Sequence, residues 1–224
     1  MSRVIAIKPK SAESTSNPGE RAPRRASRTR AQILATINLA AIEVFAREGL
    51  SGASTQAIAD RAGLSKARLH YYIESKEALY RQVLQDVIDD WINVFGFSDE
   101  AQGPRKVLSD YIRRKMVFSF EQPLRSHIFA MEMMRGAPQL RPMLPNSKRR
   151  TAQAVAVIQN WIDQGLMQRI DPLLLLFNVW AITQFHADHA EQVSYFSDRP
   201  VSVRERESTI AQTIEFVLRG AGVG

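Results

Sequence analysis

The chain has no cysteine among its 224 residues. This absence excludes disulfides, thiolate metal sites and cysteine nucleophiles, and it is consistent with a reducing cytoplasm. No stretch reaches about 18 consecutive apolar residues, so we expect neither a membrane-spanning helix nor a membrane partner. The early basic residues are not followed by the apolar run of a secretory signal, so the sequence does not favour export.

Signatures of catalysis are also missing. The sequence has no glycine-rich phosphate-binding loop, no Gly-x-Ser-x-Gly element and no trio of metal ligands, and its carboxylates are scattered. His186 and His189 are three residues apart and could face one metal ion on a helix, but a third ligand is lacking. We therefore expect a protein that is not an enzyme and that carries no cofactor.

Positive charge is concentrated at the N-terminus. Residues 1–30 contain eight Lys or Arg and two Glu, a net charge of +6, whereas residues 31–80 are neutral and residues 81–224 carry +1. Residues 1–28 contain Ser, Pro, Gly and Arg without periodicity, which predicts a disordered basic arm. Such an arm is either a solvated tail or an electrostatic aid to DNA binding.

From Thr29 onward the sequence predicts an all-α fold, because apolar residues recur at helical spacing and no useful alternating pattern appears. The prolines fall at the joints between expected helices. We expect an N-terminal three-helix helix-turn-helix domain over residues 29–75. A larger helical ligand-binding and dimerisation domain is expected over residues 76–224. The expected helices lie at about 29–49, 55–62, 65–72, 75–97, 105–121, 124–136, 146–164, 171–193 and 202–219.

Residues 55–72 have the pattern of a helix-turn-helix. Thr55 and Ser65 are suited to cap two short helices, and the small Ala59 lets those helices approach closely. Gly63 lies at the turn, where we expect a positive φ. Arg68, on the exposed side of the second helix, is the candidate for a bidentate contact with guanine. An ordinary helical hairpin is the alternative, but all these features together favour DNA binding.

The continuous segment 30–80 resembles the DNA-binding domain of the TetR family, through helix Ile33–Glu48, the following Gly49-Leu50 pair and the element Ser75–Leu79. The resemblance implies a cytoplasmic, all-helical homodimer that binds double-stranded operator DNA and is released by a small effector, usually as a repressor. His70 departs from the family pattern and is expected to alter operator preference. By resemblance, the DNA-contacting positions are Thr55, Gln56, Ser65, Lys66, Ala67, Arg68, His70, Tyr71 and Lys76.

Residues 105–195 are similar to the regulatory domain of the RutR-like group within that family, which responds to pyrimidines. The similarity is carried by Phe129–Pro138, Trp161–Gly165 and Ile170–Asp188. It implies a small-molecule effector such as uracil, thymine or a related planar ring. The candidate ligand-binding residues are Phe129, Glu132, Met133, Trp161, Trp180, Gln184 and Asp188.

Spacing supports part of this set independently, because Trp180, Gln184 and Asp188 follow one another at four-residue intervals on one helix face. An aromatic wall with an amide suits a planar ligand, although core packing is the alternative for both tryptophans. Glu132 has the alternative of pairing with Arg135. The last two expected helices have broad apolar faces, which predict core packing and a dimer interface together. For the whole chain, a ligand-independent or architectural DNA-binding protein is the alternative.

Overall fold

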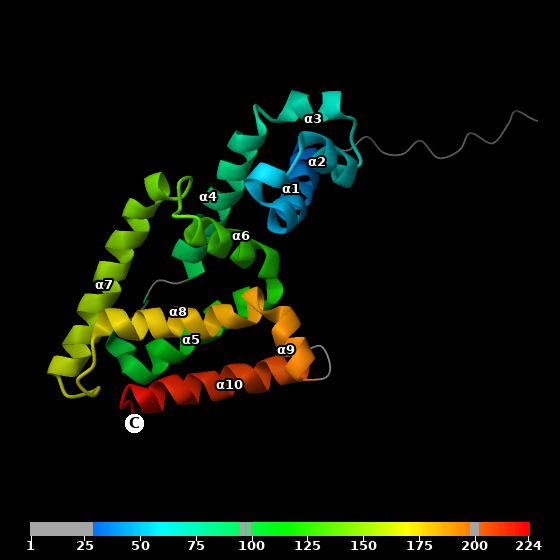
Figure 1. Ribbon diagram of the computed structural model, residues 1–224. Helices are drawn as coiled ribbons and strands as arrows, with labels where there is room; N and C mark the ends of the chain where they lie inside the picture. The colour runs from blue at the N-terminus through cyan, green and yellow to red at the C-terminus, as the bar shows by residue number, and fades with distance from the viewer. Residues whose placement is uncertain (1–28, 95–96, 98–99, 198–201) are drawn as a thin grey trace, which may run out of the picture.

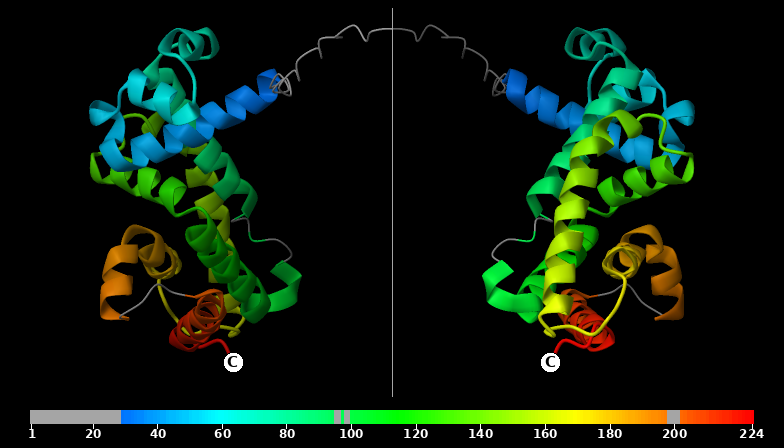
Figure 2. Two further views of the ribbon diagram at one scale, coloured as in Figure 1. Left: turned by 90° about the vertical axis from the view of Figure 1, so that its right-hand side faces the viewer. Right: turned by 90° about the vertical axis from the view of Figure 1, so that its left-hand side faces the viewer.

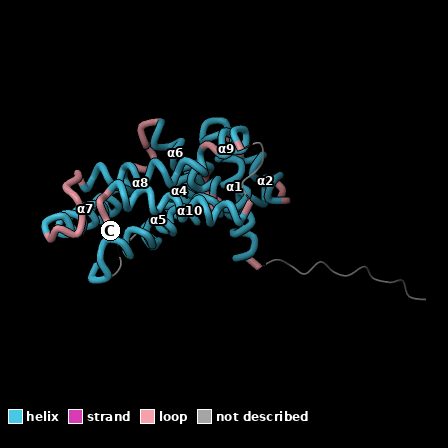
Figure 3. The backbone as a smooth tube through the Cα atoms, turned by 90° about the horizontal axis from the view of Figure 1, so that it is seen from below, coloured by secondary structure: helices cyan, strands magenta, loops and turns pink. Residues whose placement is uncertain are grey.

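The computed structural model describes residues 29–94, 97, 100–197 and 202–224 (Figure 1). Within these residues every regular element is a helix, which confirms the all-α prediction (Figure 3). The predicted basic arm, residues 1–28, lies outside the described residues.

Three helices form a group at one end of the molecule, namely α1 (Arg30–Gly52), α2 (Thr55–Ala62) and α3 (Lys66–Tyr72). Helix α4 (Lys76–Val94) leads from this group toward the remaining helices, as both side views show (Figure 2). Because α3 lies at the far end of the group, its outer side faces away from the rest of the protein (Figure 1).

The other helices form the larger part of the molecule. They are η1 (Glu100–Gln102), α5 (Gly103–Glu121), α6 (Pro123–Met134), η2 (Arg141–Met143), α7 (Leu144–Asp163), α8 (Pro172–Asp188), α9 (Ala190–Phe196) and α10 (Val203–Gly220). Helix α5 packs against both α8 and α10, and α6 packs against α1, α4 and α8. The expected helix 171–193 is broken at His189, whose φ of −121° and ψ of 33° are not helical and whose ring stacks on Phe185.

Serine caps fix where the helices near the N-terminus begin. As expected, Ser65 accepts a hydrogen bond from a backbone N–H in the first turn of α3, and Ser75 does the same for α4. The cap of α2 is Ser54, which accepts from the Ala57 N–H at 3.0 Å, so the prediction of Thr55 as the cap is wrong by one residue. Each cap satisfies an N–H that the helix leaves open and contributes about 1 kcal/mol.

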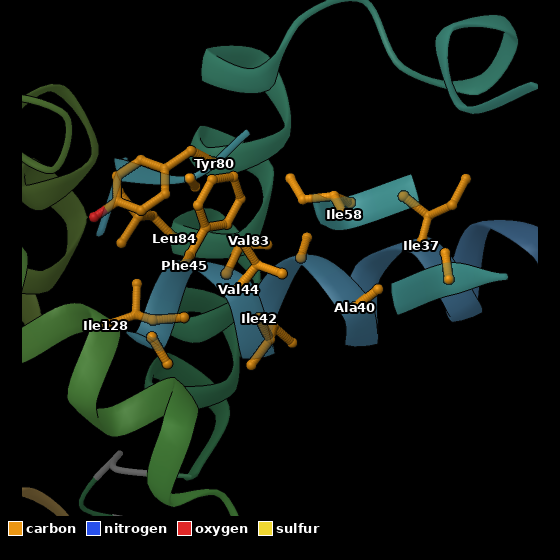
Figure 4. Packing of buried hydrophobic residues seen from close by; sticks show 14 of the residues in the cluster. Ile37, Ala40, Ile42, Val44, Phe45, Ile58, Tyr80, Val83, Leu84 and Ile128 are labelled. Carbon is orange, nitrogen blue, oxygen red and sulfur yellow. The ribbon is translucent and has the colours of Figure 1, made fainter. Parts of the chain in front are cut away.

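Two clusters of buried apolar side chains form the core. The first joins α1, α2, α3 and α4 with α6, and Figure 4 shows Phe45, Tyr80 and Ile128 meeting from α1, α4 and α6. The rings of Phe45 and Tyr80 meet edge to face, with centroids 4.9 Å apart. The second cluster joins α5, α7, α8 and α10. Helix α6 therefore belongs to the core of the helix-turn-helix group although it follows α5 in the chain.

Polar contacts reinforce this junction. The Tyr80 hydroxyl donates a hydrogen bond of 3.0 Å to Glu132 Oε2 on α6, and the Gln139 N–H donates to the other carboxylate oxygen at 2.7 Å. Burial and the Glu132 carboxylate raise the pKa of Tyr80. Beside this pair, the guanidinium of Arg135 lies so close to Gly49 that a Cβ built there would be 2.7 Å from Nη1. The end of α1 thus fits directly against the end of α6.

We predict that Gly49→Ala lowers the free energy of unfolding by about 2–3 kcal/mol, because backbone near φ 65° and ψ 178° is almost restricted to glycine. The new Cβ would also displace Arg135. Gly63→Ala is the matched control, since its φ of 66° and ψ of 37° are left-handed helical and its Cβ would meet nothing within 4 Å. The control should lose only about 1 kcal/mol. Urea unfolding measures both losses, and equal losses would contradict the prediction.

Candidate DNA-binding surface and ligand cavity

The helix-turn-helix is held by side chains that are completely buried. Ile58 and Ala59 of α2 and Leu69 of α3 each have a relative exposure of 0%. Between the two helices Gly63 adopts the left-handed conformation that the sequence predicted. Because the close-packed side chains leave α2 and α3 little freedom, α3 presents a fixed surface to the solvent.

The outer surface of α3 is polar and basic. Tyr71 is 74% exposed, although its ring packs edge to face against Tyr72 with centroids 5.1 Å apart. Thr55 and Lys76 are half-buried at the margins of this surface. The remaining predicted DNA-contacting residues are all exposed, namely Gln56, Ser65, Lys66, Ala67, Arg68 and His70.

Lys76 and Gln56 each donate a side-chain hydrogen bond within the protein. Lys76 Nζ donates a hydrogen bond of 2.7 Å to the carbonyl oxygen of Ala53, which ties the start of α4 to the loop before α2. Gln56 Nε2 donates to Asp60 Oδ1 at 2.7 Å along the exposed face of α2. Lys76 therefore fixes α4 relative to the helix-turn-helix, a structural task that the sequence pattern did not reveal.

A cavity of about 860 Å³ lies between α4, α5, α6, α7 and α8. Five aromatic rings contribute to its wall, from Trp91 on α4, Phe97 in the following segment, Tyr111 on α5, Phe129 on α6 and Trp180 on α8. The ring centroids of Trp91 and Phe129 are 4.1 Å apart. Such an apolar wall with a few polar groups is typical of a small-molecule site.

The cavity brings together four of the seven predicted ligand-binding residues, because Phe129, Met133, Trp180 and Gln184 all line it. Trp180 Nε1 donates a hydrogen bond of 2.6 Å to the Tyr111 hydroxyl. This contact fixes the plane of the indole ring against the cavity.

The other three predicted residues do not line the cavity. Glu132 is buried at the junction with α4, where it bonds to Tyr80 and Gln139 rather than to Arg135. Trp161 is 3% exposed and belongs to the second core cluster, with its ring stacked on Phe97. Asp188 accepts a hydrogen bond of 3.3 Å from Gln184 Nε2 and therefore orients a residue of the cavity wall.

Lys115 of α5 is a member of the wall that the sequence interpretation missed. It is only 5% exposed, and its Nζ lies 5.0 Å from the centroid of the Trp91 ring. Burial lowers the pKa of its ammonium group to about 7. The available signal was its place in line with Leu108 and Ile112 on the buried face of α5, where a lysine is rare.

The expectations about metals and membranes can be compared with the described part of the chain. No group of three His, Cys, Asp or Glu in those residues could hold a metal ion. None of the helices described is both long enough and apolar enough to span a bilayer.

Comparison with protein families gives two matches that follow each other along the chain. Residues 37–83 match the family described as bacterial regulatory proteins, tetR family. Residues 84–223 match the family described as YcdC-like protein, C-terminal region. The first match covers the helix-turn-helix, and the second covers the helices that surround the cavity.

Individual proteins agree with these matches. The HTH-type transcriptional regulator RutR of Escherichia coli K12 is 38% identical over 181 residues, which are 80% of this chain and 84% of RutR. Among solved structures, the ketosteroid transcriptional regulator KstR2 of Mycobacterium tuberculosis has a TM-score of 0.69 at 20% identity, covering 90% of this chain and 100% of KstR2. AibR in complex with isovaleryl coenzyme A and operator DNA has a TM-score of 0.63 at 15% identity, covering 82% of this chain and 96% of AibR.

We predict that Lys115→Met raises the melting temperature at neutral pH. The folded chain holds the ammonium with a pKa of about 7, against the ordinary 10.5, so between these values the unfolded chain binds more protons. Wild-type stability therefore rises with pH across that window, and the gain from methionine shrinks as the pH approaches 10.

Thermal unfolding at several pH values from 6 to about 10 tests this prediction. Lys106→Met is the control, because Lys106 is an exposed lysine of the same helix that pairs with Asp110. If Lys115→Met raised the melting temperature by the same amount at every pH, burial of the charged ammonium group could not be the origin of the gain.

Proposed function

Because the chain belongs to the TetR family of bacterial transcriptional regulators, we propose that it is a dimeric repressor whose operator binding ends when a small effector fills the cavity. The observation that carries this proposal is that α4, whose first residue holds the helix-turn-helix, contributes Ile88, Trp91 and Ile92 to the cavity wall. A ligand in the cavity therefore touches the helix that positions the DNA-binding surface. Operator binding assigns the protein to the cytoplasm, and we propose no catalytic role for any residue.

Operator recognition is assigned to α3, whose N-terminal turn would enter the major groove. Arg68 suits this task, because it is exposed while the neighbouring Leu69 is buried and anchors the helix. A guanidinium can form two parallel hydrogen bonds to guanine. Thr55 and Tyr71 lie at the margin of the same surface and suit phosphate contacts, which position a protein without reading sequence.

Dimerisation is assigned to the exposed side of α8. Leu174, Phe177 and Phe185 are 52%, 48% and 40% exposed and recur at helical spacing along that side, and on α10 Phe216 is 69% exposed. An apolar stripe of this kind is costly to leave in water. A two-fold pair of chains would cover it and would place two copies of α3 about one DNA turn apart.

For the effector we propose a planar, partly polar molecule, with uracil and thymine as the first candidates. The indole of Trp180 offers a flat apolar surface, and the side chain of Gln184 offers an amide one helical turn away on the same wall. An amide can donate to a ring carbonyl and accept from a ring N–H, which matches the edge of a pyrimidine.

Signal transfer is assigned to α4 and α6 together. Both helices line the cavity, and both pack in the core of the helix-turn-helix group. A ligand that separates or rotates them must shift α1 through Ile128 and through the contact of Arg135 with Gly49. Release requires that the ligand binds more tightly to the arrangement that does not fit the operator.

We predict that Arg68→Ala lowers affinity for the operator by about tenfold to a hundredfold, the size expected from about 1–3 kcal/mol of base discrimination. Affinity for scrambled DNA should change much less. Arg61→Ala is the matched control for loss of one charge, because Arg61 is an exposed arginine on α2 that pairs with Glu43. The operator is first selected from genomic fragments, and gel shifts then compare the two DNAs. An equal loss on both would favour the architectural alternative.

We also predict that uracil or thymine releases the operator in a gel-shift titration, and that Gln184→Leu abolishes release while operator affinity is kept. Gln159→Leu is the control, because Gln159 is an exposed glutamine of α7 that bonds to Asp163 and does not line the cavity. Failure of both pyrimidines on the wild type would reject them as effectors. Failure of every metabolite in a broad screen would favour the ligand-independent alternative.

A further inference from the structure

The cavity is larger than a single planar ring requires. Its volume of about 860 Å³ is near the upper end of the range of about 300–1,000 Å³ that is usual for sites of drug-sized ligands. Trp180 and Gln184 on α8 occupy one part of its wall, while Ser147 and Thr151 on α7 and Lys115 on α5 contribute other parts. The effector therefore has room for a second group beyond the ring.

The charged groups on the wall are mostly cationic. Lys115 comes from α5, and Lys148 and Arg150 come from the beginning of α7. Among the described lining residues the single carboxylate is Glu100. Lys148 and Arg150 are exposed, so they stand where solvent reaches the cavity, whereas Lys115 is deep in the wall. A positive potential in a partly enclosed, apolar space attracts anions.

Lys115 gives this potential a definite position. Burying an ammonium group costs free energy, and the face of the Trp91 ring, 5.0 Å from Nζ, is one contact that offsets part of this cost. Burial lowers the pKa of Lys115, so the side chain can be neutral near pH 7. Binding of an anion in the cavity would then be coupled to uptake of a proton by Lys115. The side chain is thus suited to meet an anion and poorly suited to plain core packing.

We propose that the cavity prefers an effector whose planar ring also carries an acidic group, and that Lys115 holds this acidic group while the aromatic wall holds the ring. This assignment rests on the proposed function, since it takes the cavity to be the effector site. It also connects ligand charge with α4, because the acidic group would compete with the Trp91 ring for the same ammonium. Charge recognition and signal transfer then meet at one pair of side chains.

The test uses two fluorescent probes that differ in one sulfonate group. 1-Anilinonaphthalene-8-sulfonate is anionic, and N-phenyl-1-naphthylamine is its neutral counterpart. Both become bright in an apolar cavity, so each is titrated into the full-length dimer. We expect the anionic probe to bind at least about tenfold more tightly, the ratio that one charged contact provides.

Variants locate the preference. Lys115→Met should remove most of the preference for the sulfonate while keeping the neutral probe, and Lys148→Gln at the exposed rim should reduce it by a smaller factor. Lys106→Met, which changes an exposed lysine of the same helix, should leave both affinities unchanged. Equal binding of the two probes to the wild type, or an unchanged preference in Lys115→Met, would overturn the proposal. Thermal unfolding confirms that each variant is folded.

The outcome is separable from that of the proposed function. Operator gel shifts are run on the same proteins without and with each probe. A charge preference that depends on Lys115 supports the inference even if no compound releases the operator. Release by a neutral compound, without any charge preference, supports the proposed function and overturns the inference.

Discussion

The packing of α6 against α1 and α4 is the contact on which the rest of the molecule depends. Ile128 of α6, with Ala137 and Leu140 just after that helix, completes a core whose other buried members come from α1 to α4, and Glu132 and Arg135 add polar contacts at its edge. A close-packed interface of this kind has few alternative arrangements, so it shifts as a unit rather than deforming gradually. The helix-turn-helix is consequently not an independent module, because one of its core walls belongs to a helix that also borders the cavity.

The sequence predicted the parts of the fold that local rules determine. Gly63 at the turn, Ser65 as a cap and the small Ala59 between the helices follow from backbone geometry and helical spacing, and the structure agrees with each. Boundaries were less predictable, since Ser54 and Thr55 are adjacent and both belong to the residue types that cap helices. The break at His189 was missed because neither glycine nor proline marks it.

The cavity-lining residues were predictable only where regular spacing places them on one face of the same helix. Trp180 and Gln184 both line the cavity, as their spacing suggested. Glu132 and Trp161 are on α6 and α7, two helices that border the cavity, yet both side chains are buried in packed interfaces instead. Long-range packing decides which face of a helix meets which neighbour, and the sequence does not show this directly. Lys115 is a cavity-wall residue that the sequence interpretation missed, although a charged residue in a row of apolar residues on the buried face of α5 is unusual.

Helix α8 carries both cavity-lining residues and an exposed apolar stripe, and this has a thermodynamic consequence. Trp180 and Gln184 line the cavity, while Leu174, Phe177 and Phe185 form the neighbouring stripe, where the ring centroid of Phe177 is 5.4 Å from that of Trp180. Any rotation of this helix moves both sets of side chains, so self-association and ligand uptake would be linked equilibria. The cellular abundance of the protein would then help to set its sensitivity to the ligand: a scarce regulator and a plentiful one, identical in sequence, would respond at different metabolite levels.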